Sequence, residues 1–263
     1  MLDQVTTVIL TYNEIPNINR TLAALQWAGE IVVVDSGSDD GTVEYCESLP
    51  NVRVINRKFD THSQHWNFAV AGTGIESPWI LAMDADYLLT PRLRDEMAAL
   101  DPPPGVKGYR VNFFYCVFGQ RLRGNLYPPV TVLFRNGSGH YQQDGHTQRL
   151  VLDGEVRELA NRMLHDDRKD SGRWLVSQYR YAELEVDLLM NTPWSALRWQ
   201  DRLRCCMLII PWLVPLYCLV LKGGVLDGPA GWYYAMQRGL AEGILSLCLL
   251  ERRIRGKAGK SGQ

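Results

Sequence analysis

Short apolar runs alternate with segments of helical spacing over the first hundred residues. The runs are five to seven residues long and largely apolar on both faces, which is typical of strands in a parallel sheet that helices cover on both sides. The predicted strands are Val5–Thr11, Ile31–Asp35, Val52–Asn56 and Trp79–Met83, and the predicted helices are Ile15–Trp27, Asp39–Leu49, His65–Ala71 and Pro91–Leu100. The alternation predicts an α/β fold with a doubly wound, mostly parallel twisted sheet flanked by helices.

Polar residues gather where three of these strands end. The first strand runs into Thr11–Glu14, the second into Asp35–Thr42 and the fourth into Asp84–Asp86. The carboxyl ends of parallel strands lie at one edge of a sheet, and ligands of doubly wound folds bind at that edge. The sequence therefore predicts an acidic ligand site there.

Several classes of protein are disfavoured. The turn after the first strand, Tyr12–Pro16, has no glycine and no basic residue, so it matches neither a dinucleotide fingerprint nor a loop that holds a triphosphate. With 28 Lys+Arg against 29 Asp+Glu, the formal charge is −1, and we expect no nucleic-acid partner. The six cysteines form no C-x-x-C pair, so we expect neither a zinc ribbon nor a disulfide framework, and a reducing compartment fits better.

The turn Asp84-Ala85-Asp86 is a candidate metal site. Two carboxylates in a turn can reach one hard cation, Mg²⁺ or Mn²⁺, and that cation can hold a diphosphate. The other interpretation is a solvated turn or a helix cap before Pro91. The position directly after an apolar strand favours the metal site.

Asp35 and Glu14 each allow two interpretations. Asp35 closes an apolar strand at the ligand edge, so it can accept a hydrogen bond from a nucleobase, or it can close an Asx turn in the loop that follows. Glu14 can contact a ribose or cap the helix predicted to begin at Ile15.

The runs VILTYNE, IVVVDSGSDDGT and WILAMDAD resemble the three nucleotide-binding segments of family 2 glycosyltransferases. Within that family, the stretch Gln64–Ala71, the DAD turn and the C-terminal LKGGVLDGPAG resemble the lipopolysaccharide-core glucosyltransferase branch, and the similarity spans roughly Val5 to Gly231. The resemblance implies a GT-A fold and transfer of a sugar from a nucleotide diphosphate with inversion.

The resemblance also implies roles for single residues. The nucleotide-binding residues are Thr11, Tyr12, Glu14, Asp35 and Asp84. Thr11, Glu14 and Asp35 would hold the uridine, while Asp84 would hold the ribose or the metal ion. Asp86 would bind the metal ion itself.

Two departures from the branch concern the second half of the site. The branch usually has a Glu directly after the DAD turn, and here the residue is Tyr87. The branch also usually carries a His-Glu pair later in the chain, whereas this chain reads DGHTQR over residues 144–149.

Asp144 is the candidate catalytic base. Displacement at an anomeric carbon needs a base on the acceptor side, and Asp144 follows a strand-like segment in a turn that contains glycine. The other interpretation is an ordinary turn aspartate. In the run His165–Lys169, His165 can be a further metal ligand, and Arg168 or Lys169 can neutralise a phosphate, or the run is a solvated segment.

The last third of the chain has a different composition. Residues 198–263 hold 10 Lys+Arg against 4 Asp+Glu, and Cys205–Leu221 is free of charge over 17 residues but contains Pro211 and Pro215. We expect residues 1–197 to form the GT-A domain and residues 198–263 to form a basic, apolar helical tail that lies on a membrane or enters it as a hairpin. The other interpretation is a buried helical hairpin or an oligomer interface.

These observations predict a metal-dependent, inverting hexosyltransferase. The expected donor is a nucleotide-diphosphate sugar, most simply UDP-linked, and the expected acceptor is a lipid-linked saccharide of the bacterial envelope. The enzyme would be peripheral or monotopic on the cytoplasmic face of the bacterial inner membrane, because basic residues flank the apolar tail. One alternative is a polyprenyl-phosphate glycosyltransferase, and another is a non-catalytic, membrane-docked nucleotide-binding protein.

Overall fold

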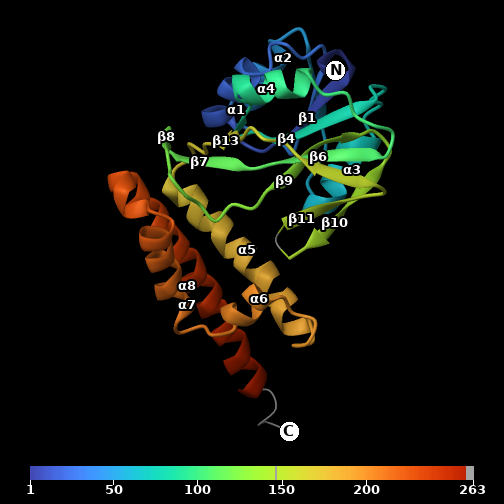
Figure 1. Cartoon of the computed structure of the whole chain (residues 1–263). Coiled ribbons are helices and arrows are strands. Elements are labelled where there is room, and N and C mark those ends of the chain that lie inside the picture. The colour runs from blue at the N-terminus through green and yellow to red at the C-terminus, as the bar shows by residue number, and fades with distance from the viewer. Residues whose placement is uncertain (146, 259–263) are drawn as a thin grey trace. The chain divides into compact units, whose positions relative to one another are not determined.

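The computed structural model describes residues 1–145 and 147–258 (Figure 1). The chain divides into two compact units. The first, here named the sheet unit, comprises Met1–Arg121 and Tyr127–Lys169. The second, here named the helical unit, comprises Leu122–Leu126 and the residues from Asp170 onward.

The sheet unit contains a seven-stranded sheet with the order β12-β6-β9-β4-β1-β2-β3. Its strands are β1 (Val5–Thr11), β2 (Ile31–Asp35), β3 (Val52–Asn56), β4 (Trp79–Asp84), β6 (Val106–Val111), β9 (Val130–Arg135) and β12 (Glu155–Glu158). Strands β3, β2, β1 and β4 are parallel to one another, and β9 is antiparallel to β4 and β6. The four predicted strands and the predicted α/β fold are confirmed.

Helices and a hairpin cover the two faces of this sheet (Figure 1). One face is covered by three helices, α1 (Ile15–Ala23), α2 (Thr42–Glu47) and α4 (Pro91–Ala98). The other face is covered by α3 (His62–Ala71) and by the hairpin of β10 (Gly139–Asp144) and β11 (Thr147–Leu152). A short 3₁₀ helix, η1 (Leu2–Gln4), precedes β1. Alternate residues of β1 serve the two cores: Ile9 packs with α1 and α4, and Val8 packs with α3. Burial on both faces explains why the strands are nearly continuous apolar runs.

The order of the strands sets the position of the ligand edge. From β1 the chain proceeds outward through β2 and β3 and then returns to pair β4 on the other side of β1. The register places Thr11 opposite Asp35, and Leu10 opposite Asp84. The carboxyl ends of β1, β2 and β4 therefore meet at the point where the strand order reverses, which is where doubly wound folds bind ligands.

A smaller sheet of four strands completes the sheet unit. Its order is β5-β13-β7-β8, with β5 (Tyr87–Leu88), β13 (Met163–His165), β7 (Phe113–Val117) and β8 (Gln120–Arg121). Phe118 and Gly119 turn the chain between β7 and β8 with φ angles of 49° and 86°, the pair of positive values that a type I′ hairpin turn requires. The consecutive strands β6 and β7 belong to different sheets, since β6 lies in the large sheet and β7 in the small one.

The helical unit is an assembly of helices. Its elements are α5 (Ser171–Asn191), α6 (Trp199–Arg204), α7 (Ile210–Leu216), the π-helical turn η2 (Tyr217–Leu221), the 3₁₀ turn η3 (Gly224–Asp227) and α8 (Gly228–Ala258). Apolar residues of α5 and α8, including Val186 and Leu249, form a buried cluster. Because α5 packs on α8, the compact units divide at Asp170, whereas the composition of the chain changes at residue 197.

The charge-free segment of the helical unit is exposed. Pro211 lies in the first turn of α7 and Pro215 inside it, and the segment continues as the π-helical turn η2. Leu208 is 81% exposed and Trp212 79%. Among the described residues no single helix is long and apolar enough to cross a membrane, but Ile210–Leu221 and Gly224–Arg255, bent by 72°, meet the length and composition criteria as a pair.

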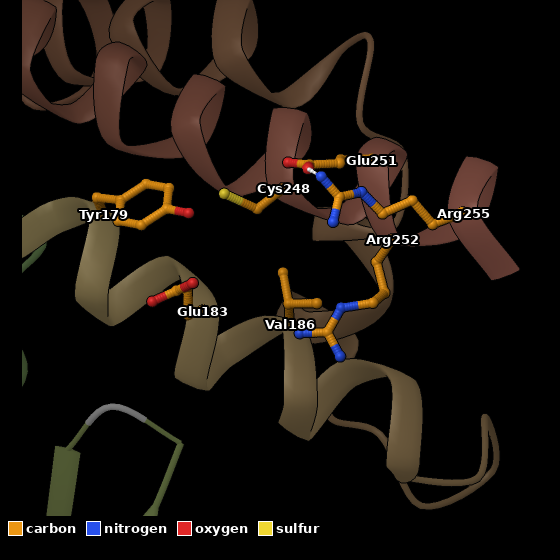
Figure 2. A pocket seen from close by; sticks show the side chains of 7 residues that line it. All are labelled: Tyr179, Glu183, Val186, Cys248, Glu251, Arg252 and Arg255. Atoms are coloured by element: carbon orange, nitrogen blue, oxygen red, sulfur yellow. Dashed lines mark ion pairs between the residues drawn. The ribbon is translucent and has the colours of Figure 1, made fainter.

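Helices α5 and α8 also enclose a hollow of about 210 Å³ (Figure 2). Its lining residues are Tyr179, Glu183, Val186, Cys248, Glu251, Arg252 and Arg255. The arginines at this hollow form ion pairs with nearby carboxylates. The guanidinium group of Arg255 lies 2.6 Å from the carboxylate of Glu251, and that of Arg252 lies 3.2 Å from the carboxylate of Asp187. The residues predicted to bind donor and metal all belong to the sheet unit instead.

Candidate functional site

The carboxylate of Asp35 organises the end of β2. It is fully buried; Oδ1 accepts hydrogen bonds from the backbone N–H groups of Gly37 and Ser38, both at 2.8 Å. Oδ2 accepts the hydroxyl groups of Thr11 at 2.7 Å and Ser38 at 2.5 Å. The carboxylate of Asp35 therefore closes an Asx turn in the loop that follows β2, as one of the two interpretations expects. A direct hydrogen bond from Asp35 to a nucleobase stays a prediction.

The loops after β1 and β2 hold each other at this edge. The backbone N–H of Asn13 donates to Ser38 Oγ at 2.7 Å, and the N–H of Asp39 donates to Asn13 Oδ1 at 2.8 Å. Asn13 has a φ of 56°, in the left-handed region that asparagine tolerates better than most residues. Tyr12, directly before it, is 54% exposed, so an aromatic surface lies beside the loop of Asp35.

Glu14 does not cap helix α1 with its side chain. Asp40 accepts the N–H of Ile15 at 3.2 Å, while Oε2 of Glu14 accepts from Asn17 Nδ2 at 2.9 Å and Oε1 lies 2.5 Å from Lys169 Nζ. Burial raises the pKa of Glu14 to about 7 although Lys169 opposes the rise. The side chain of Glu14 therefore does not cap helix α1, and its carboxylate faces Lys169 instead.

Asp84 and Asp86 lie together at the end of β4. Burial, with the nearby charge of Asp86, raises the pKa of Asp84 to about 6. Burial also acts to raise the pKa of Asp86, but His165 and Lys169 outweigh it and the pKa is lowered. Perturbed pKa values cluster at functional sites, so these two half-buried carboxylates with opposite pKa shifts mark a candidate site.

His165 faces this pair of carboxylates. Its Nε2 lies 3.2 Å from Asp86 Oδ2. Rings of the small sheet and its neighbouring loop surround the imidazole, with centroids at 4.5 Å for Tyr127, 4.7 Å for Tyr115 and 5.4 Å for Tyr87. Burial lowers the pKa of His165, but the carboxylates of Asp86, Asp84 and Asp167 together raise it more, so the net shift is upward.

These side chains fit a divalent cation that is shared with a diphosphate. Asp86 Oδ1 and His165 Nδ1 are buried, and within the described part of the chain neither has a hydrogen-bond partner. Residues 1–145 and 147–258 contain no group of three or more His, Cys, Asp or Glu side chains arranged to hold a metal ion alone. Mg²⁺ commonly takes one or two carboxylates together with substrate phosphate oxygens, which is the donor set that Asp84 and Asp86 provide.

Residues 166–169 bind to helix α1, a contact that the sequence did not predict. Asn17 is fully buried, and its side-chain oxygen accepts the N–H of Arg168 at 2.9 Å and a guanidinium N–H of Arg20 at 2.9 Å. Its amide nitrogen donates to Glu14 and, at 2.8 Å, to Asp167. A buried asparagine beside Ile18 on the core-facing stripe of a predicted helix is the signal that could have indicated this network.

Tyr87 occupies the position where the similar branch usually has Glu. Its hydroxyl contacts the hydroxyl of Tyr127, and its side chain hydrogen-bonds to Asp84. Burial raises the pKa of both tyrosines well above the ordinary value, so both are neutral phenols. Tyr87 therefore contributes a hydroxyl, and not a further carboxylate, to the site.

Asp144 is the last residue of β10 and pairs with Thr147 in β11. Its backbone carbonyl accepts the hydroxyl of Thr147 at 2.9 Å, and Gly145 follows with a φ of 61°. Position 146 in the DGHTQR segment lies outside the described residues. The structure thus places Asp144 in a hairpin that packs on α3, separate from the strands that carry Asp84 and Asp86, and its role as the base stays a prediction.

Comparison with known proteins gives the family. The sequence profile of "Glycosyl transferase family 2" matches residues 6–151. The lipopolysaccharide core biosynthesis glycosyltransferase LpsC of Rhizobium meliloti (strain 1021) is 27% identical over 194 residues, which cover 68% of this chain and 69% of LpsC. An uncharacterized glycosyltransferase of Rickettsia bellii (strain RML369-C) is 35% identical over 95 residues, covering 36% of this chain and 31% of that protein.

Among solved structures, S. aureus TarS 1-349 in complex with UDP-GlcNAc is 13% identical, with a TM-score of 0.44, over 96% of this chain and 92% of that chain. The profile match includes β1, β2, β4 and the hairpin β10–β11, and so covers the strands that carry the candidate nucleotide site. Because that match extends over more than half of the sequence, the chain belongs to glycosyl transferase family 2.

Proposed function

We propose that this chain is an inverting hexosyltransferase that transfers a sugar from a UDP-linked donor to a lipid-linked saccharide of the bacterial envelope. The observation that carries the proposal is the convergence of Glu14, Asp84, Asp86 and His165 at the carboxyl edge of β1 and β4. The lipopolysaccharide-core relative supports an envelope saccharide as the acceptor.

The loops at the ligand edge provide the nucleotide side of the proposed site. Thr11 and Asp35 fix the loop after β2, and the ring of Tyr12 lies exposed beside it. In this arrangement Tyr12 offers a stacking surface for the base, and Asp35 acts by holding the backbone of Gly37 and Ser38 in place.

Asp84, Asp86 and His165 would hold a Mg²⁺ or Mn²⁺ ion together with the diphosphate. The ion would supply positive charge against the diphosphate as it departs. The contribution of the protein is to keep these side chains desolvated and oriented, which the surrounding tyrosine rings do for His165.

Asp144 is the proposed base, which would take the proton of the acceptor hydroxyl from the side opposite the diphosphate. An acceptor with a polyprenyl phosphate would need no base, because its attacking oxygen is already anionic. Asp144→Asn separates these cases: loss of transfer to a saccharide acceptor supports the base, and retained transfer contradicts it.

The exposed apolar residues of the helical unit support an acceptor in a membrane. Leu208 and Trp212 are nearly fully exposed, and basic residues of α8 such as Arg252 and Arg255 lie further along the chain. Exposed apolar side chains in a segment of net positive charge are typical of segments that bind anionic lipid. We therefore place the enzyme, in this proposal, at the cytoplasmic face of the inner membrane.

The first test is a thermal-shift panel of UDP, GDP, CMP and ADP, each with and without Mn²⁺, on the full chain in detergent. The proposal expects UDP with Mn²⁺ to raise the midpoint and Asp86→Ala to remove that effect. A ligand at 100 times its Kd should stabilise the fold by about 2.7 kcal/mol. Asp95→Ala, an exposed carboxylate paired with Arg94 on α4, is the matched control. Absence of any shift by a nucleotide in the wild type would contradict the donor assignment, and binding without turnover would indicate a non-catalytic protein.

A further inference from the structure

Arginine side chains gather around Phe114 in the small sheet. The guanidinium groups of Arg121, on β8, and of Arg162, directly before β13, both lie over the ring of Phe114, the second at 4.9 Å from the ring centroid. Both arginines are exposed. In the described part of the chain neither forms an ion pair with a carboxylate.

Two further arginines lie next to them and share one carboxylate. Oδ2 of the buried Asp166 accepts from Arg20 at 2.7 Å and from Arg168 at 3.0 Å, and its Oδ1 accepts the N–H of Gly119 at 3.0 Å. Arg168 remains 41% exposed. The negative charge of Asp166 is thus paired with Arg20 and Arg168.

The thiol of Cys116 shows that these groups form one neighbourhood. Burial raises the pKa of Cys116 to about 11, Asp166 adds to the rise, and the charges of Arg121, Arg168 and Arg20 oppose it. Three guanidinium groups therefore act on one buried atom, against a single carboxylate. Arg162 lies over the neighbouring ring, and Glu96 accepts the N–H of Asn161, directly before Arg162, at 2.8 Å.

The geometry of the pair on Phe114 suits an oxyanion. A guanidinium that stacks on an aromatic face keeps its N–H edge free for two parallel hydrogen bonds to phosphate or carboxylate oxygens. Clusters of arginine are a recurrent means of binding phosphate groups. Arg121 and Arg162 reach the ring from β8 and from the residue directly before β13, the two strands that neighbour β7. Two cations beside one ring repel each other, and a bound anion reduces that repulsion.

We propose that Arg121 and Arg162, with Arg168 beside them, form a binding site for a phosphate group. Phe113 and Tyr115 flank Phe114 in β7 and lie near His165, so Phe114 points to the opposite face of the small sheet. The site is therefore distinct from the proposed donor site and does not depend on the proposed function.

The test measures phosphate binding to the full-length protein at low ionic strength by titration calorimetry with inorganic phosphate. In parallel, cosedimentation compares vesicles of phosphatidylcholine with and without phosphatidic acid. The variants are R121Q/R162Q, R121K/R162K and the control R53Q/R157Q, whose exposed arginines pair with Glu30 and Glu155 and which loses the same charge.

We expect R121Q/R162Q to weaken binding at least about tenfold, R121K/R162K to weaken it less, and R53Q/R157Q to bind like the wild type. Loss of binding to inorganic phosphate assigns the site to soluble phosphate groups, and loss confined to vesicles with phosphatidic acid assigns it to lipid headgroups. The proposal is overturned if the wild type binds neither probe or if the two glutamine variants lose binding equally. It is also overturned if R121Q/R162Q binds both probes like the wild type, the result expected if phosphate occupies the donor site instead.

Discussion

Nζ of Lys169 lies 2.5 Å from Oε1 of Glu14, although 155 positions separate the two residues in the sequence. Both side chains are largely buried, with exposed fractions of 21% and 12%. Burial lowers the pKa of Lys169, but Glu14, Asp167 and Asp86 together raise it further, so the lysine is charged. The pair is ionic where Glu14 is ionised, above its pKa of about 7. This pair ties the end of the sheet unit to the start of helix α1, beside the candidate donor site.

Replacement of Lys169 by alanine should destabilise the protein strongly. The substitution leaves the carboxylate of Glu14 buried without its cation, and breaking a buried pair in this way costs about 3 kcal/mol or more. Urea unfolding at pH 8 measures the loss. The control is Arg53→Ala, since the pair Arg53–Glu30 is about 40% exposed and should contribute less than about 1 kcal/mol.

The loss in Lys169→Ala should depend on pH. The folded pKa of Glu14, about 7 in the wild type, lies above its unfolded value of 4.5 and should rise further without Lys169. A carboxyl group whose folded pKa is raised is best accommodated in its protonated form, so the defect should be smallest near pH 5 and grow as the pH rises through 7. An equal loss at pH 5 and pH 8 would contradict this account.

Metal binding should strengthen with rising pH. Asp86 holds the pKa of His165 above its ordinary value, so the imidazole carries a proton at pH 6 that a metal ion must displace. In the presence of UDP we expect the affinity for Mn²⁺ to rise by up to about tenfold per pH unit below that pKa. Titration calorimetry between pH 6 and pH 8 measures the slope. In His165→Gln the slope should fall, and a wild-type affinity that does not change with pH would argue against His165 as a ligand.

The strands and their carboxyl ends could be predicted from the sequence because they depend on local pattern. Apolar runs such as Ile31–Asp35 are buried on both faces, and the sheet aligns their ends without further information. The helix predicted at Asp39–Leu49 begins three residues later, at Thr42, because Gly41 precedes it as the N-cap with a φ of 93°. In the turn before the helix, Asp40 Oδ1 accepts the N–H of Thr42 at 3.1 Å. Capping residues are visible in sequence, but which of several candidates acts depends on neighbouring loops.

The contacts between distant segments could not be predicted. The pairing of Lys169 with Glu14, and of Asp166 with Arg20, depends on the path of β13 beside β7, which no local pattern encodes. The run His165–Lys169 was open to interpretation as a solvated segment, yet Asp166 is 4% exposed. The sequence indicates that these charged residues are present, but the chain topology determines which of them pair.

Asn17→Asp should disrupt the start of helix α1. The substitution removes the two N–H groups that Asn17 donates and sets a carboxylate against Glu14 and Asp167. We expect a loss of about 2–4 kcal/mol in unfolding free energy and a higher KM for the donor at a smaller change in kcat. The control is Asn51→Asp, because the side-chain amide of Asn51 donates to the carbonyl of Ala28 at 2.8 Å and is not part of the network at Glu14. A donor KM like that of the wild type would show that Asn17 does not position Glu14.

The cysteines should divide sharply in their reactivity. Burial raises the pKa of Cys46 to about 12 and that of Cys116 to about 11, so almost no thiolate forms at pH 8. Cys206 is exposed. A disulfide-exchange reagent at pH 8 should therefore modify Cys206 in the native protein, whereas Cys46 and Cys116 should react only after unfolding in urea. Mass spectrometry of the modified peptides tests this, and rapid labelling of Cys116 would contradict the buried small sheet.

Membrane binding should depend on the exposed face of α7. Trp212 and Leu216 are 79% and 57% exposed, and each contributes about 1.5–3 kcal/mol when it is buried in an apolar phase. Trp212→Ser/Leu216→Ser should therefore weaken cosedimentation with anionic vesicles by at least tenfold, while Phe59→Ser/Val156→Ser, which removes exposed apolar residues of the sheet unit, should not. If both variants sediment like the wild type, the exposed apolar face of α7 does not bind the membrane and serves protein contacts instead. Cross-linking would then identify those contacts, because the wild type should form larger oligomers than the Trp212→Ser/Leu216→Ser variant.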